Sequence, residues 1–340
     1  MTIVVDVLVV LVALALIAWL ISPLETLIWW QRDGAEATAR AKDEFTRALP
    51  NPSPAPSSPT GAPDQDAPHC YLLYLSGIAA FDDDFLPRAE RPILRRLERS
   101  FANLTVVGTI YPYAADNRSL IDDRPSSPIW KWVASKQGSR RWTGVISMLI
   151  NLRNAYQVLV SADPRYGPVF SAGVAQSLWK QLAAAGYQPG SRANIVLLGW
   201  SGGAQIAAGA AWYLGSAGAR VSLISLGGIL TADPGLRRCQ EIVHLVGTKD
   251  WQTRWFAPVL FPSRRRWARH SAWREAISEG RLTQHMIGPF RHVGRGSYLS
   301  GARLDDGRTC SQVTSEAIAR ALVEADLATL RADDQHTHHG

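Results

Sequence analysis

Residues 194–214 read NIVLLGWSGGAQIAAGAAWYL, and this stretch decides the fold. The run NIVLL at 194–198 is short and apolar, which is typical of a buried strand. Gly199-Trp200-Ser201-Gly202-Gly203 follows at once, and residues 203–214, rich in alanine, read as a helix. The stretch therefore predicts a strand, a tight turn that carries a serine, and a helix close to the sheet.

The turn matches the pattern G-x-S-x-G in the strand-to-helix context that the pattern requires. A serine on such a strained turn needs glycine at Gly199 and Gly203, because larger side chains would collide with neighbouring backbone. A glycine-rich turn with an inert Ser201 remains the alternative. A phosphate-cradling loop is disfavoured, since the sequence has neither GK[ST] nor G-x-G-x-x-G here.

Working outward, short apolar runs alternate with segments of helical spacing. The predicted strands are 70–76, 104–111, 194–198, 221–226, 242–246 and 283–287, and the other predicted helices are 88–101, 172–185 and 311–330. This alternation favours an α/β fold with a mostly parallel central sheet and helices on both faces.

Two stretches, 117–167 and 251–281, fit this alternation poorly and are predicted to be cap-like inserts over Ser201. The first ends in WTGVISMLINLRNAYQVLV, which is long enough to span a membrane. Its polar residues, including Arg153 and Asn154, would be costly in a bilayer, so it is interpreted as a helix with one apolar face. The second is rich in Trp and Arg and suits either an anionic membrane surface or a surface helix with buried Trp; single-stranded nucleic acid is a weaker candidate.

The N-terminus carries the predicted membrane anchor. Residues 3–21 are apolar except Asp6 and long enough to cross a bilayer as a helix, with tryptophans at and beyond the far end. A cleaved signal peptide is the alternative, but no basic residue precedes the run. Arg32, Arg40 and Lys42 follow it, which places the rest of the chain in the cytoplasm.

The remaining organisation follows from composition. After an anchor region at 1–30, residues 31–68 are predicted to be an exposed helix and a proline-rich linker, 69–331 the globular domain, and 332–340 a disordered tail. The chain has 340 residues, a formal net charge of +7 and three well-separated cysteines. These cysteines suggest buried thiols rather than a disulfide framework or a metal site, and no cofactor is expected.

At the GWSGG motif the chain resembles the α/β-hydrolase superfamily, over residues 69–330. In that family a nucleophilic serine is followed along the chain by an acid after a late strand and a histidine before the last helix. The resemblance implies an α/β-hydrolase fold with Ser201 as nucleophile.

Asp250, directly after the strand at 242–246, is the predicted acid, and Asp233, in an Asp-Pro-Gly turn, is the reserve. His292, in a glycine-rich loop before the closing helix, is the predicted base. His285 lies in an apolar run and is interpreted as a core histidine, whereas His270 lies among arginines and is expected to be solvated.

In this scheme Ser201 attacks a carbonyl carbon and His292 takes its proton. The oxyanion requires backbone N–H donors, which are predicted at Gly202 and in the turn at Gly77 and Ile78. The HGGG sequence that many esterases carry there is absent.

The expected function is a membrane-anchored serine hydrolase that cleaves a carboxylic ester or thioester of an apolar, lipid-like substrate. A peptidase or amidase with the same triad is one alternative. A non-catalytic binding or scaffold protein on the same fold is another. The sequence leaves acyl-chain length and oligomeric state open.

Overall fold

The computed structural model of the chain describes residues 69–79, 89–107, 110–114, 143–264, 268 and 270–331. The predicted anchor, the linker at 31–68, residues 117–142 of the first insert and the tail at 332–340 lie outside these residues. Among the helices that are described, none combines the length and the apolar character needed to span a bilayer.

A six-stranded parallel sheet forms the centre of the domain, in the order β2-β1-β3-β4-β5-β6. The strands are β1 (Cys70–Leu75), β2 (Leu104–Val107), β3 (Asn194–Trp200), β4 (Arg220–Leu226), β5 (Cys239–Gly247) and β6 (Leu282–Ile287). All residues of β1 and β3 are buried, as expected for central strands of a parallel sheet covered on both faces. The predicted parallel α/β architecture is therefore confirmed.

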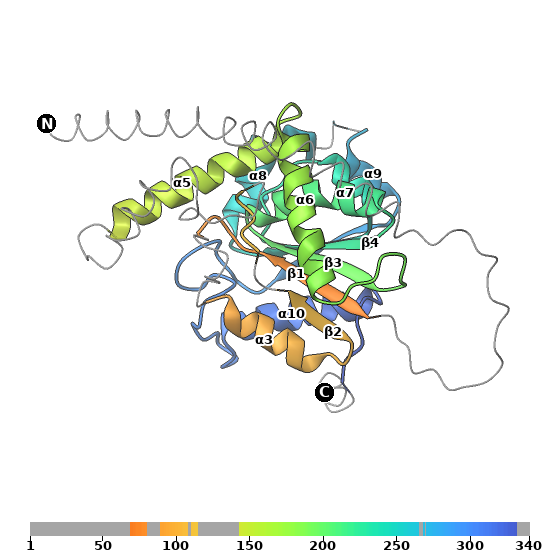
Figure 1. The fold of residues 1–340 in the computed structure, drawn as a ribbon. Coiled ribbons are helices and arrows are strands. Elements are labelled where there is room, and N and C mark those ends of the chain that lie inside the picture. The colour runs from red at the N-terminus through yellow and green to blue at the C-terminus, as the bar shows by residue number, and fades with distance from the viewer. Residues whose placement is uncertain are drawn as a thin grey trace, which may run out of the picture.

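Helices cover both faces of the sheet (Figure 1). One face packs against α5 (Thr143–Ala162), α6 (Gly167–Ala184), α7 (Gly203–Ser216) and α9 (Ala272–Ser278), and the other against α3 (Arg91–Ser100) and α10 (Cys310–Glu324). Successive strand residues divide between the two cores: Ile195 and Leu197 lie in the first, Val196 and Leu198 in the second. This is the period of two that a pleated strand imposes.

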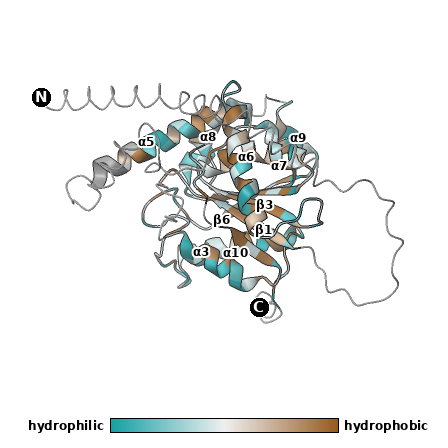
Figure 2. Ribbon diagram, in the orientation of Figure 1, coloured by the Kyte–Doolittle hydropathy of each residue, from teal (hydrophilic) through white to brown (hydrophobic). Residues whose placement is uncertain are grey.

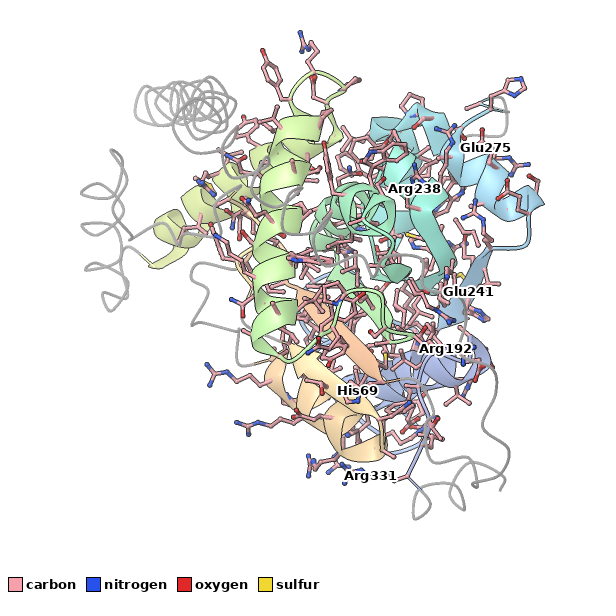
Figure 3. The ribbon with its side chains drawn as sticks, turned by 45° about the vertical axis from the view of Figure 1, so that its right-hand side comes forward. His69, Arg192, Arg238, Glu241, Glu275 and Arg331 are labelled. Atoms are coloured by element: carbon pink, nitrogen blue, oxygen red, sulfur yellow. The ribbon has the colours of Figure 1, made fainter. Side chains whose placement is uncertain are left out.

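Polarity follows the same layering. In Figure 2 hydrophobic residues gather on the central strands, whereas α3 carries hydrophilic residues on its outer side. Charged residues such as Arg192, Arg238 and Arg331, which are labelled in Figure 3, are exposed. The three cysteines are buried free thiols, as predicted.

Two predicted elements end earlier than expected. The strand predicted at 104–111 ends at Val107. The closing helix ends at Glu324, because Asp326 adopts a φ of 51° and the N–H of Leu327 turns back to the carbonyl of Leu322. The chain then pairs Leu330 with Phe101, which ties the end of the domain to the end of α3.

Helix α5 differs from the prediction of a single apolar buried face. Arg153 and Asn154 are buried, whereas Leu159 is exposed. Distant segments accept hydrogen bonds from both side chains: Arg153 donates to the carbonyl of Tyr113 at 2.9 Å and Asn154 to that of Ile78 at 2.8 Å. The helix thus packs against α6 and α7, and polar side chains join it to the segment at 110–114 and to the turn after β1.

Candidate active site

Ser201 occupies the sharp turn between β3 and α7. Its φ is 53°, in the left-handed region that residues other than glycine rarely adopt. The turn is held by two backbone hydrogen bonds, from Ser201 N–H to the carbonyl of Leu226 at 3.0 Å and from Ile229 N–H to the carbonyl of Ser201 at 3.1 Å. A strained backbone fixed in this way is a common feature of functional sites.

The flanking glycines have the steric role that the sequence predicts. A Cβ atom on Gly199 would lie 2.4 Å from the Cα of Ala204, and one on Gly203 would lie 2.4 Å from the carbonyl oxygen of Leu75. Both contacts are with backbone, which cannot move away cheaply. The strand, the turn and the helix can therefore approach this closely only with glycine at both positions.

The three residues predicted as a triad lie in one hydrogen-bonded chain. Ser201 Oγ is 2.8 Å from His292 Nε2, and His292 Nδ1 is 2.9 Å from Asp250 Oδ2. An ionised carboxylate only accepts, so Nδ1 carries the proton and Nε2 accepts from the serine hydroxyl. All three side chains are buried. They come from the turn after β3, the turn after β5 and the loop between β6 and α10.

Asp250 is fully buried and accepts four hydrogen bonds. Besides His292, its donors are the N–H of Thr253 at 3.0 Å, the hydroxyl of Thr253 at 2.8 Å and the hydroxyl of Tyr298 at 2.7 Å. Burial alone raises the pKa of Asp250. The hydrogen bond and charge of His292, with the other donors, outweigh burial and lower that pKa to about 2. The carboxylate is therefore ionised and fixed in orientation at neutral pH.

Tyr298 is a part of the site that the sequence analysis missed. Its hydroxyl donates to Asp250 and accepts from the N–H of Gly247 at 2.7 Å, so it links the acid to the end of β5. Burial, together with the charge of Asp250, raises the pKa of Tyr298 well above its ordinary value. Tyr298 lies in the same loop as His292, but no spacing rule marks it.

Trp200 supports the base from the other side. Its ring stacks on the His292 imidazole with centroids 5.0 Å apart and planes at 22°, and it meets the Tyr298 ring edge-on. Gly77 makes room for it, because a Cβ on Gly77 would lie 2.6 Å from the Trp200 ring. Trp200 occupies the first variable position of the G-x-S-x-G pattern, so its place beside Ser201, though not its contact with His292, could be predicted from the sequence.

The predicted oxyanion donors lie beside the serine. A Cβ on Gly202 would be 3.1 Å from Ile78 Cγ2, which puts the two residues in contact. Across the described ranges, no protein acceptor is bonded to the backbone N–H of Gly202 or of Ile78. The turn is anchored by its carbonyls, with Tyr113 Oη donating to Ser76 and Asn154 to Ile78, each at 2.8 Å. Among the described residues, both N–H groups therefore lack an acceptor, as the donors of an oxyanion hole must.

The other candidate residues lie elsewhere. Asp233 accepts from the N–H of Gly235 at 2.8 Å, as its turn predicts, and from Gln205 Nε2 at 2.9 Å. His285 is exposed, so its interpretation as a core histidine was wrong. It lies on β6, one of the two edge strands, which has a neighbouring strand on one side only. His270 is exposed, as expected.

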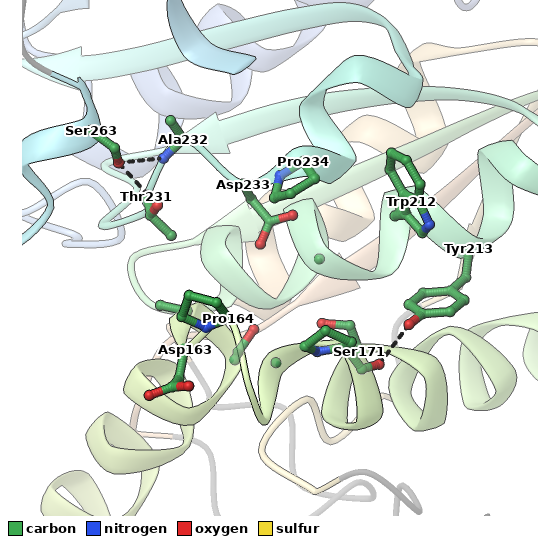
Figure 4. A pocket seen from close by; sticks show the side chains of 15 residues that line it. Asp163, Pro164, Ser171, Trp212, Tyr213, Thr231, Ala232, Asp233, Pro234 and Ser263 are labelled. Atoms are coloured by element: carbon green, nitrogen blue, oxygen red, sulfur yellow. Dashed lines mark hydrogen bonds between the residues drawn. The ribbon is translucent and has the colours of Figure 1, made fainter. Parts of the chain in front are cut away.

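A cavity of about 430 Å³ beside α7 is separate from this hydrogen-bonded chain (Figure 4). Trp212, Tyr213, Asp233 and residues of α5 and α6 line it, but Ser201, Asp250 and His292 do not. The surface next to the Ser201–His292–Asp250 site carries exposed apolar side chains. Val293, next to His292, is 64% exposed, and Trp251, next to Asp250, is 60% exposed.

No protein-family model, curated protein or solved structure matches this chain. The interpretation of the site therefore depends on its own geometry.

Proposed function

We propose that the protein is a serine hydrolase of the α/β-hydrolase type that cleaves a carboxylic ester or thioester of an apolar, lipid-like substrate. The observation that carries this proposal is the hydrogen-bonded chain from Ser201 through His292 to the ionised Asp250. The positive φ of Ser201 supports it, because a strained strand-to-helix turn of this kind places a nucleophilic serine at the carboxyl edge of a sheet.

The geometry supports a two-step acyl transfer. His292 Nε2 accepts the proton from Ser201 as Oγ attacks the carbonyl carbon, and the negative oxygen is met by the N–H groups of Gly202 and Ile78. His292 then gives the proton to the leaving alcohol or thiol, which leaves an acyl-serine. Water, deprotonated by His292, attacks the acyl carbon; the bond to Ser201 Oγ then breaks, His292 returns the proton to Oγ, and the carboxylic acid is released. Asp250 stabilises the imidazolium in both steps.

The surroundings of the site support an apolar substrate. Trp251, Trp255, Phe256 and Val259 expose large apolar side chains on the segment that begins next to Asp250. Clusters of exposed apolar residues mark sites of contact with apolar ligands, membranes or partners. Together with the apolar residues 3–21, they support a substrate drawn from a bilayer surface by a domain on its cytoplasmic side.

Covalent labelling tests the proposal. The full chain in detergent is treated with a fluorophosphonate, and the intact mass is measured. One adduct is expected on the wild type, none on Ser201→Ala, and one on the matched control Ser161→Ala, which removes a buried hydroxyl elsewhere. If the folded wild-type protein forms no adduct, the hydrolase proposal is wrong, and a non-catalytic binding protein on the same fold is the remaining interpretation.

Turnover of p-nitrophenyl esters and of aminoacyl anilides then separates ester from amide cleavage. We expect the esters to be cleaved, with rates that rise with acyl-chain length. Preference for the anilide would instead indicate a peptidase or amidase.

A further inference from the structure

A half-buried arginine, Arg264, lines a cavity together with Thr253, whose hydroxyl donates to Asp250 of the site. The Arg264 guanidinium lies over the Trp273 ring, with Cζ 4.1 Å from the ring centroid. It donates to the carbonyl of Leu230 at 3.3 Å and to His244 Nε2 at 3.2 Å, whereas its Nε is buried and has no hydrogen-bond partner among the described residues. Burial lowers the pKa of Arg264 to about 10, yet the group remains a cation at neutral pH. A buried cation is costly unless an anion is close.

The nearest titratable neighbour does not compensate this charge. A guanidinium only donates, so His244 Nε2 is the acceptor, and Nδ1 carries the proton that faces Ser225 Oγ at 3.0 Å. Burial and the Arg264 charge hold the pKa of His244 well below its usual value. His244 is therefore neutral, and the positive charge of Arg264 is left without a counter-ion among the residues that the structure describes.

Arg264 and His244 face a cavity of about 230 Å³. Arg254, Thr253, Gln284 and Trp273 also line it, and none of the aspartates and glutamates that the structure describes does. Arg254 is a second cation at the exposed side, and Gln284, from β6, adds an amide donor. Hydrogen-bond donors thus approach the space from several elements.

From this arrangement we infer that the cavity binds an oxyanion of the phosphate or sulfate class, held by Arg264 and Arg254. A planar carboxylate is matched by one guanidinium, whereas donors on several sides suit a tetrahedral group. A free phosphate compound and the phosphate of a lipid headgroup share this chemistry. The site differs from the Ser201 centre, although Thr253 touches both the cavity and Asp250.

Anion titration tests the inference independently of hydrolase activity. The full-length Ser201→Ala chain in detergent is titrated with inorganic phosphate, and separately with sulfate, at constant ionic strength. We expect a saturable rise in the unfolding temperature, since a ligand that binds only the folded state stabilises it. Arg264→Gln should weaken binding about tenfold or more, as for loss of a hydrogen bond between charged groups. The matched control Arg308→Gln, an exposed arginine paired with Asp306 and Glu316, should bind as before.

Equal affinity in Arg264→Gln, or a response that does not saturate, would mean an adventitious ion only and would overturn the inference. Gln284→Glu covers the case in which Arg264→Gln does not fold, because it adds a negative charge at an exposed wall of the cavity. Binding that survives Gln284→Glu overturns the inference as well. A parallel titration with dihexanoyl phosphatidic acid identifies the source: tighter binding than inorganic phosphate indicates a lipid headgroup, and weaker binding a free phosphate compound.

Discussion

Tyr298→Phe removes one hydroxyl and keeps the ring that packs on Trp200. The lost group donates to the ionised Asp250 and accepts from Gly247 N–H, each at 2.7 Å. A hydrogen bond to a charged group contributes about 1.5–3 kcal/mol, and a buried N–H left unpaired costs about 1–3 kcal/mol. Asp250 keeps its bonds to Thr253 and His292, so the two effects overlap in part. We expect a loss of about 2–4 kcal/mol in the free energy of unfolding at neutral pH.

Urea unfolding of the full chain measures this loss, with Tyr213→Phe as the matched control. The Tyr213 hydroxyl donates a single bond of 2.7 Å to the carbonyl of Pro168 at a more exposed place, so its removal should cost about 1 kcal/mol or less. Fluorophosphonate labelling of Tyr298→Phe should slow by about tenfold or less, because Asp250 stays ionised and oriented. A cost for Tyr298→Phe no larger than that for Tyr213→Phe would refute the reasoning that this hydroxyl completes a buried network.

Three further outcomes are expected. Asp250→Asn should slow fluorophosphonate labelling of Ser201 by roughly 10³-fold or more at pH 7, since an amide leaves the imidazole in the wrong tautomer; near-normal labelling would rule out Asp250 as the acid. Glu90 precedes α3, is buried, and accepts hydrogen bonds from the hydroxyl of Ser76. Burial raises the pKa of Glu90 to about 7, although its hydrogen bonds lower that pKa in part, so the folded state holds this proton more tightly than the unfolded state. The contribution of protonated Glu90 to the free energy of unfolding is fully present below pH 4.5 and is lost as the pH rises through 7. Glu90→Gln should therefore be more stable than wild type at pH 8, by up to about 3 kcal/mol, but not at pH 4.5, as urea unfolding at the two pH values will show. Gly199→Ala should destabilise the fold by more than about 3 kcal/mol in thermal unfolding, whereas Gly301→Ala, where a Cβ meets nothing within 4 Å, should change it by about 0.5 kcal/mol or less.

Local patterns were enough to predict much of the fold. Strands β1 and β3 are buried on both faces, so nearly all of their residues are apolar, and such continuous apolar runs can be recognised in the sequence. The turn at Ser201 was predictable because its steric requirements fall on residues two positions away, Gly199 and Gly203. Asp250 and His292 were predicted from the resemblance to the α/β-hydrolase superfamily, in which the acid follows a late strand and the histidine precedes the last helix.

Other features depend on contacts between distant segments. His285 is exposed because β6 lies at the edge of the sheet. An apolar run in the sequence predicts a strand but does not show whether that strand is central or at the edge. Arg153 is buried because a carbonyl of the segment after β2 accepts from it. Tyr298 and Arg264 gained their partners only through folding, and neither has a local signature. Long-range hydrogen bonds of this kind are the part that pattern analysis could not supply.

The hydrogen-bonded chain at Ser201 also has a consequence for biosynthesis. Its members are far apart along the polypeptide: 91 residues separate Ser201 from His292, and 42 separate Asp250 from His292. A chain made from its N-terminus presents the serine long before its base exists, and contacts of such sequence separation form late in folding. The turn at Ser201 forms early, when β1, β3 and α7 associate. The Ser201 hydroxyl gains its proton acceptor, His292, only after the segment beyond β6 has left the ribosome and packed against the sheet. In the hydrolase proposed above, a nascent chain therefore has no activated serine until its domain is nearly complete.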